Sequence, residues 1–391
     1  MKKISIKRAQ SKQACSVERE KFGTKFKIKF LLMAFVAMTL SAGFVACSSD
    51  DDDNNTPAAQ QSNFEKYMTA VENEVKAKKA QSGHKKALLL VAFGSTWENA
   101  HKTFREGIIK DYENDAAFKS EYDVYFAFTS AKCINRSREG EHYASQNFYA
   151  PNYYLEAIGR VKYEEVRVQS LHVIPGEEFL RLRDTYVKDF KNNIYADLDA
   201  EYLENGVKIF IGGPLMESEE DVESVATVLN NEFSQYVQGD NVMAFLGHGN
   251  PEGYNYGNGN VRYDQLEEAL QRKNPNYFVA TVDQEDNLLN DLYVRMQDQG
   301  KVKQGVTMTL HALMCIAGDH AHNDMSGIEN ENDSWREFFA NHGFKCQYNG
   351  NDSDTSNNCI LKGLGDYASI RAIWKKHTRE ATEMFVEEEE E

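Results

Sequence analysis

The sequence predicts an α/β protein with parallel β-sheets, because two patterns alternate along the chain. Short, continuous apolar runs that end near glycine are typical of strands buried on both faces. Amphipathic stretches with helical spacing lie between these runs, and the repeated order of strand, helix and strand is typical of a parallel sheet. The pattern restarts near residue 240, so we expect two similar α/β halves, 63–240 and 241–391.

The expected elements follow one another in chain order. Apolar residues between Phe64 and Lys79 have helical spacing, and the run 85–95 is the first expected strand. The later expected strands are 124–131, 166–174, 207–215, 242–249, 277–283 and 306–314. Amphipathic helices are expected at 221–236 and 263–273, and a last helix is expected to begin near Tyr367.

The N-terminal segment has the pattern of a targeting sequence. A basic region ends at Lys29, and an uncharged apolar run follows that is at the lower limit for a membrane-spanning helix. Cys47 comes directly after this run and resembles the lipidated cysteine of a bacterial lipoprotein. We therefore expect a signal peptide over 1–46, a lipid anchor at Cys47 and a disordered polar tether over 47–62. We therefore also expect the protein to be exported and anchored to the outer membrane, on its periplasmic or cell-surface side.

The net charge limits the kinds of partner, and two of the cysteines suggest a disulfide. The net charge of −17 argues against nucleic-acid binding. Cys346 and Cys359 flank a polar loop, and export would place them in a compartment that permits disulfides. We therefore expect a bridge between these two cysteines, with two free thiols as the alternative.

Polar side chains gather where the expected strands end. Ligands of open α/β sheets bind beyond the carboxyl ends of the strands, so these residues are candidates for a site. In the first half they are Ser95, Thr96, Thr129, Ser130, His172, Glu177 and Glu178. In the second half they are His248, Asp283 and His320. We expect both halves to contribute to one cleft.

Eight motifs occur in an order that resembles the anaerobic sirohydrochlorin cobaltochelatase family, the class II tetrapyrrole chelatases. They are LLLVAFGSTWENAHKTF, FAFTSAKCI, VQSLHVIPGEEF, GGPLMES, FLGHG, AGDHAHNDMSG, ENDSWREFF and GLGDYASIRAIW, and they cover roughly residues 85 to 378. The resemblance implies two Rossmann-like halves that face a central tetrapyrrole cleft. It also implies insertion of Co²⁺ into sirohydrochlorin, as in anaerobic cobalamin biosynthesis, with Fe²⁺ or Ni²⁺ as alternative metals and no organic cofactor.

The resemblance implies a metal site made of His248, Asp283 and His320. The family generally has Glu where this chain has Asp283, so the metal would sit differently, or Glu285 would take its place. Two neutral imidazoles and one carboxylate suit Co²⁺, Fe²⁺, Ni²⁺ or Zn²⁺ and leave positions open for the ring nitrogens of a tetrapyrrole.

The neighbouring polar residues of the second half are expected to have supporting roles. His311 lies inside a strand and is expected to be a core residue. His322 is expected to support a ligand by hydrogen bonding. Asn323 and Asp324 are expected to cap the helix that follows.

Metal insertion also requires a base, because two pyrrole protons leave the macrocycle. Glu178, in the block HVIPGEEF, is the candidate, and His172 lies beside it in the sequence. The residues expected to bind the tetrapyrrole are Ser95, Thr96, Thr129, Ser130 and Tyr254.

The predicted export conflicts with this activity, since sirohydrochlorin is a cytoplasmic intermediate. An alternative function is a surface haem-binding lipoprotein that captures haem or removes its iron, with an outer-membrane receptor as partner. The loop 248–260 favours this alternative weakly, because Tyr254 and Tyr256 could ligate ferric haem.

Overall fold

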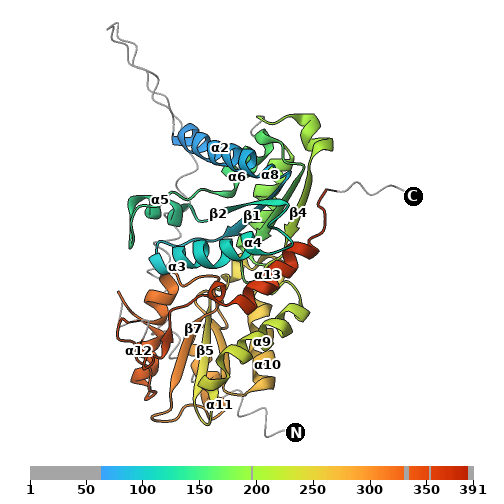
Figure 1. Ribbon diagram of the computed structural model, residues 1–391. Coiled ribbons are helices and arrows are strands. Elements are labelled where there is room, and N and C mark those ends of the chain that lie inside the picture. The colour runs from blue at the N-terminus through green and yellow to red at the C-terminus, as the bar shows by residue number, and fades with distance from the viewer. Residues whose placement is uncertain (1–62, 195–196, 330–333, 352–353, 386–391) are drawn as a thin grey trace, which may run out of the picture. The chain divides into compact units, whose positions relative to one another are not determined.

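The computed structural model describes residues 63–194, 197–329, 334–351 and 354–385, which belong to one compact unit, Gln61–Glu391 (Figure 1). The predicted signal peptide, Cys47 and the tether lie outside these residues. Among the described residues, no helix is both long enough and apolar enough to cross a membrane.

Two four-stranded parallel sheets form the body of the protein. The first has the order β2-β1-β3-β4, and its strands are β1 (Lys86–Ala92), β2 (Tyr122–Phe128), β3 (Glu165–Ser170) and β4 (Lys208–Gly212). The second has the order β6-β5-β7-β8, and its strands are β5 (Val242–Gly247), β6 (Tyr277–Thr281), β7 (Met308–Ala312) and β8 (Cys359–Ile360). The two orders are equivalent, which confirms the predicted fold class of two similar α/β halves.

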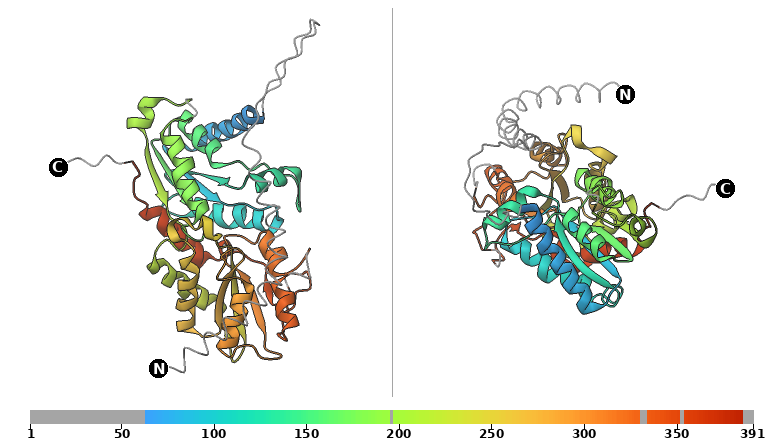
Figure 2. Two further views of the ribbon diagram at one scale, coloured as in Figure 1. Left: turned by 180° about the vertical axis from the view of Figure 1, so that it is seen from behind. Right: turned by 90° about the horizontal axis from the view of Figure 1, so that it is seen from above.

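Helices connect the strands in both halves. Those before β5 are α2 (Asn63–Ser82), α3 (Glu98–Lys102), η1 (Thr103–Ile109), α4 (Lys110–Asn114), α5 (Ala131–Glu139), α6 (Pro151–Val161), α7 (Glu177–Arg181), η2 (Leu182–Val187), α8 (Lys188–Lys191), η3 (Tyr202–Gly206), α9 (Glu219–Phe233) and η4 (Ser234–Val237). Those after β5 are η5 (Glu252–Tyr254), η6 (Tyr256–Asn258), α10 (Val261–Lys273), α11 (Leu289–Asp298), η7 (His320–Met325), α12 (Trp335–Asn341), η9 (Leu364–Asp366) and α13 (Ala368–Glu380). Helices α2 and α6 lie side by side in the first half (Figure 2).

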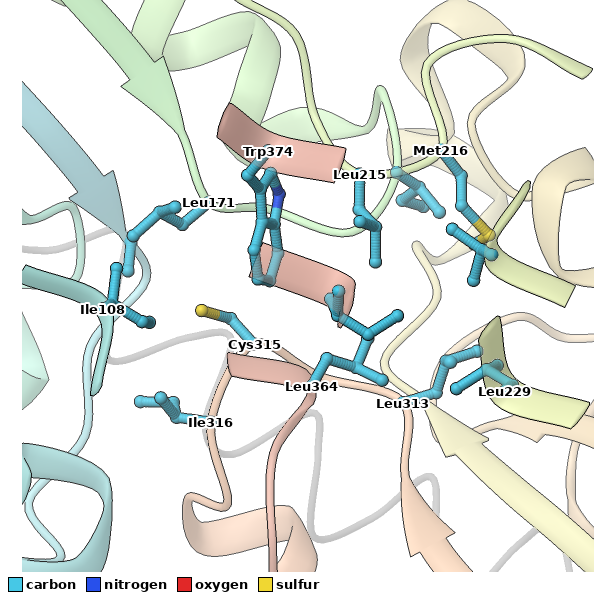
Figure 3. Close-up of a cluster of buried hydrophobic side chains, with 14 of the residues drawn as sticks. Ile108, Leu171, Leu215, Met216, Leu229, Leu313, Cys315, Ile316, Leu364 and Trp374 are labelled. Atoms are coloured by element: carbon cyan, nitrogen blue, oxygen red, sulfur yellow. The ribbon is translucent and has the colours of Figure 1, made fainter. Parts of the chain in front are cut away.

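The core continues from one half into the other. A single cluster of buried side chains includes Leu88 and Phe104 of the first half and Phe245 and Leu266 of the second. Helix α13 comes after the second sheet in the chain but packs against β3 and β4 of the first. Figure 3 shows Trp374 of α13 between Leu171 and Leu215, with Cys315 and Leu364 close by.

A buried ion pair joins α13 to the start of α9. His377 Nε2 lies 3.0 Å from Asp221 Oδ1, and both side chains are buried. Burial alone would raise the pKa of Asp221, but hydrogen bonds from His377 and Ser218 outweigh this effect and hold the pKa at about 2. Burial would lower the pKa of His377, but its hydrogen bond to Asp221 outweighs burial and raises the pKa.

Replacement of Asp221 by Asn is expected to destabilise the protein near neutral pH and to have little effect in strong acid. The depressed pKa of Asp221 contributes stability above its unfolded pKa of about 3.9, and this contribution disappears as the pH falls toward 2. The raised pKa of His377 contributes stability below about pH 6.5, which is lost as the pH rises through the folded value. The carboxylate shift corresponds to about 2.5 kcal/mol in the free energy of unfolding. Urea unfolding at a series of pH values measures it, and an equal loss at every pH would contradict the prediction.

The two cysteines expected to form a bridge are both buried and are free thiols, so the predicted disulfide is not present in the structure. Cys359 opens β8 and Cys346 precedes the polar loop. A hydrogen bond between the two thiols, together with burial, raises the pKa of Cys346 well above its ordinary value. The thiols are therefore in contact and the Cys346 thiol is poorly ionised, and only the thiolate reacts in disulfide exchange.

We expect these two thiols to oxidise slowly when the reduced protein meets glutathione disulfide at neutral pH, because burial and the hydrogen bond between the thiols disfavour the Cys346 thiolate. Mass spectrometry of unreduced peptides measures the bridge. A bridge that forms as fast as one between exposed thiols would contradict the prediction.

Candidate active site

Both sheets place polar residues at the point where the strand order reverses. In the order 2-1-3-4 this point lies between β1 and β3 in the first half and between β5 and β7 in the second. Parallel sheets of this kind bind ligands in the crevice beyond the strand ends at such a point. His172 follows β3 there, His248 follows β5 directly, and His320 opens η7 after β7. The histidines that the sequence predicts for the site therefore follow the strands at these two points.

The structure brings the three expected metal ligands together. The rings of His248 and His320 are nearly perpendicular, with their centroids 4.9 Å apart. Asp283, just after the neighbouring strand β6, has its Oδ2 3.6 Å from His248 Nδ1. Glu285, the alternative acid, is exposed to solvent. The three side chains are neighbours, but among the described residues no group of three or more His, Cys, Asp or Glu side chains is placed so that it could hold a metal ion.

A glycine turn sets the position of His248 next to Asp283. Asp283 N donates a hydrogen bond to the carbonyl oxygen of His248 at 2.9 Å. Gly249 has a φ of +75°, and a Cβ atom on it would lie 2.8 Å from Gln284 N. The second glycine of the GHG motif is therefore required for the close approach of the two turns.

Hydrogen bonds orient both imidazole rings in the same way. His248 Nδ1 lies 2.7 Å from the carbonyl oxygen of Gly249 and must donate, since the carbonyl can only accept. His320 Nδ1 lies 2.5 Å from Asp324 Oδ2. In each ring Nδ1 is engaged by an oxygen acceptor, so Nε2 is the nitrogen available to a metal.

The expected capping role of Asn323 and Asp324 is wrong. Both residues lie inside η7, and Asp324 orients His320. The cap of the next helix, α12, is Ser334, whose side chain accepts from Glu337 N. An acidic residue four positions after a histidine lies on the same helical face, which explains the contact.

The surroundings shift the pKa values of His248 and His320 in opposite directions. Burial would lower the pKa of His320, but the hydrogen bond to Asp324 and the nearby carboxylates outweigh it and raise the pKa. Burial lowers the pKa of His248, and the positive charge of His320 lowers it further. Because 47% of the His248 side chain remains accessible, water moderates this shift. Burial also raises the pKa of Asp283, against the effect of the two histidines. The site thus favours a neutral His248, the form that binds metals, whereas His320 must lose a proton before its Nε2 can bind a metal.

Glu178 of α7 is the predicted base and is held by residues of the first half. Its Oε2 accepts hydrogen bonds from Thr129 Oγ1 at 2.6 Å and from Arg181 Nη2 at 2.9 Å. Its charge influences the pKa of both His172 and His248, so it is close to both rings. Arg181 was not predicted, although its spacing of three residues from Glu178 on a helix is the signal that could have identified it.

His172 lies beside Glu178 and has one ring nitrogen without a partner. Its Nδ1 is hydrogen-bonded to Ser170 Oγ at 2.9 Å, whereas Nε2 is buried and has no hydrogen bond within the part of the chain that the structure describes. Burial lowers the pKa of His172 to about 4, so the ring is neutral at pH 7. An unpaired buried nitrogen is costly unless a ligand engages it.

The other residues expected to bind a tetrapyrrole are largely engaged within the protein. Thr96 Oγ1 is hydrogen-bonded to His142 Nδ1 at 2.8 Å, Ser95 Oγ accepts from Trp97 N, and Ser130 caps α5. Tyr254 lies in η5 and is 41% exposed. Phe93, which the sequence reasoning missed, is an exposed aromatic ring at the end of β1, with its centroid 6.5 Å from that of His248.

His311 is a core residue, as predicted. It is completely buried in β7, and its Nε2 lies 2.9 Å from Tyr367 Oη. Burial lowers its pKa to about 3. His322, expected to support a ligand, donates from Nδ1 to the carbonyl oxygen of Gly318 at 2.9 Å and packs flat on Trp97.

The fold and the site together define an α/β protein with two similar parallel sheets and with histidines and carboxylates beyond the strand ends. Comparison with known families makes the class specific. The family model for cobalt chelatase (CbiK) matches residues 86–383, so the chain belongs to the cobalt chelatase family.

Two curated relatives are similar over most of their length. The chain is 28% identical over 306 residues to the sirohydrochlorin cobaltochelatase of Salmonella typhimurium, covering 78% of this chain and 99% of the relative. It is 27% identical over 297 residues to the sirohydrochlorin cobaltochelatase CbiKC of Nitratidesulfovibrio vulgaris, covering 75% and 89%. A solved structure, SirB from Bacillus subtilis with Fe³⁺, is 13% identical and covers 75% of this chain and 94% of its own, with a TM-score of 0.45.

Proposed function

We propose that this protein is a metal chelatase that inserts Co²⁺ into sirohydrochlorin. The observation that carries the proposal is the pair of perpendicular imidazoles, His248 and His320, each with Nδ1 engaged by an oxygen and Nε2 available. Membership of the cobalt chelatase family and the names of both curated relatives support the same activity.

The metal substrate would be held by a small and incomplete set of ligands. His248, His320 and Asp283 supply two nitrogens and one carboxylate, a donor set that suits Co²⁺ and leaves positions for the ring nitrogens. Because the chain must pass the metal on, a weak and open set is more useful than a closed one. Asp283 is one methylene shorter than the Glu of the family pattern, which leaves further room at the metal.

Two groups of the first half accept the pyrrole protons. Glu178 bonds to Thr129 and Arg181 through Oε2, so within the described residues Oε1 remains to take a proton. His172 is neutral and has Nε2 without a partner. Metal ligands on one half and proton acceptors on the other can then act on opposite parts of the same macrocycle.

Haem capture is the weaker alternative. The curated relatives are named for cobalt chelation, and the family favours the chelatase function. The tyrosine loop that suggested haem contains the exposed Tyr254, a position that equally suits the rim of a tetrapyrrole cleft.

The proposal is tested by mixing purified residues 60–391 with sirohydrochlorin and Co²⁺ and recording visible spectra. We expect the spectrum of metal-free sirohydrochlorin to change to that of the cobalt complex faster than without protein. A parallel sample with haem separates the alternative: a stable haem spectrum with no cobalt insertion would contradict the proposed function and support haem capture.

We also propose that the protein is an exported lipoprotein anchored through Cys47. The support is the basic and apolar N-terminal segment followed by a cysteine and an acidic tether. The outer-membrane receptor considered with haem uptake is not part of this proposal.

The Cys47→Ala variant is expected to be released from membranes or to remain unprocessed, because it lacks the thiol that carries the acyl chains. Cys15→Ala is the matched control, since Cys15 lies within the expected signal peptide and should change nothing. Membrane fractionation and protease treatment of intact cells measure the location. Wild-type protein found in the cytosol would show that the export prediction is wrong.

A further inference from the structure

An aromatic sandwich joins the two halves beside the metal site. The indole of Trp97, which precedes α3, lies flat between two imidazoles. The His142 ring is 4.1 Å away at an interplanar angle of 13°, and the His322 ring is 3.7 Å away at 8°. Trp97 Nε1 donates a hydrogen bond to Asp319 Oδ1 at 2.7 Å. Trp97 and His142 belong to the first half, whereas Asp319 and His322 belong to the second.

The contacts of Trp97 bracket the expected metal ligand His320. Asp319 is the residue before His320 and His322 is two residues after it, and the same indole holds both. Asp324 then fixes the His320 ring from within η7. The first half therefore holds the chain on each side of a ligand that the second half supplies.

The segment needs such support because it is short. A helix of six residues, His320–Met325, cannot be stable through its own hydrogen bonds. His142, on the far face of the indole, is itself fixed by Thr96 Oγ1 at 2.8 Å and lies 3.2 Å from Glu329 Oε1 of the second half. His142, an outer ring of the stack, therefore has contacts with both halves of the protein.

We propose that Trp97 is a positioning residue for the metal, which acts by holding His320 at the place where it meets His248. The inference rests on the proposed metal site and goes beyond it, because it makes a ligand of one half depend on a side chain of the other. It follows that the protein binds its metal with full affinity only when the loop after β1 and the loop after β7 are in contact.

The test is titration of the metal-free protein with Co²⁺ alone, followed by visible absorption of the bound ion. Trp97→Leu removes both the ring stack and the N–H donor. We expect it to raise the Kd for Co²⁺ by about 10- to 100-fold, the usual effect of removing a group that orients a metal ligand. Tyr293→Leu is the matched control, because Tyr293 also packs on a histidine, His342, but within one half. The control should bind Co²⁺ as the wild type does.

Two outcomes separate this inference from the proposed function. If His320→Ala weakens Co²⁺ binding and Trp97→Leu does not, the positioning role is overturned and the metal site stands. If His320→Ala binds Co²⁺ like the wild type, the metal site itself is wrong.

Thermal unfolding shows whether Trp97→Leu is folded. If it is not, Trp97→Phe decides, since it keeps the ring and loses only the donor to Asp319. We expect its Kd to rise by about 5-fold, equivalent to one hydrogen bond, and a wild-type Kd would overturn the proposal.

Discussion

His248→Ala and His320→Ala are each expected to abolish metal insertion while the protein stays folded. Each variant loses one of two imidazoles that face one another 4.9 Å apart, and the remaining donors cannot replace it. Loss of a direct ligand should cost more than the 10- to 100-fold caused by loss of a supporting group, so turnover should fall by more than about 100-fold. Visible spectra of cobalt insertion measure turnover, and thermal unfolding measures stability.

The matched control is His342→Ala. His342 follows α12 and packs on Phe338 and Tyr293, so its loss removes an imidazole from the same half without touching the site. It should leave the insertion rate unchanged. Normal turnover in either site variant would contradict the metal assignment.

Glu178→Gln is expected to lower kcat by about 10²- to 10⁴-fold, the usual contribution of a general base. Glutamine keeps the length of the side chain and can still accept from Thr129 through its amide oxygen, but it cannot take a proton at that position. The affinity for Co²⁺ alone should change little. Stopped-flow absorption with saturating metal and sirohydrochlorin gives kcat, and a separate Co²⁺ titration gives the affinity.

Glu177→Gln is the control for this variant. Glu177 is the adjacent carboxylate in α7, and its backbone N–H points to Asn250 Oδ1 at 3.5 Å. If both substitutions lower kcat equally, the effect is one of local charge and Glu178 is not the base. Unchanged turnover in Glu178→Gln would also contradict the role.

Most of the fold could be predicted because its strands are buried on both faces. The runs that become β1 and β5 contain apolar residues at nearly every position, a pattern that identifies a central parallel strand without any long-range information. β8 could not be predicted in this way, since it has only two residues, Cys359 and Ile360. Its place in the sheet depends on pairing with β7, which no local pattern contains.

The site was predictable where residues follow strand ends and was missed where it depends on contacts between distant segments. His248, Asp283 and His320 come after strands, and the topology brings them together. Trp97 and Asp319 are separated by 222 positions in the chain, so nothing in the local pattern links them. Asp324 was assigned a capping role because Asn and Asp commonly begin helices, but the contact with His320 determines its position.

The path of α13 has a consequence for the order in which the protein can fold. Arg167 Nη1 of β3 donates to the carbonyl oxygen of Thr378, and Thr378 Oγ1 bonds to Gln169 Oε1, so β3 obtains partners more than two hundred residues later in the chain. During synthesis, the first half would emerge with one side of its core uncovered and with Gln169 Oε1 lacking the hydroxyl of Thr378, although Gln169 Nε2 already has acceptors in the first half. It can become fully stable only after α13 has been made, so the two halves mature together and not in sequence from the N-terminus.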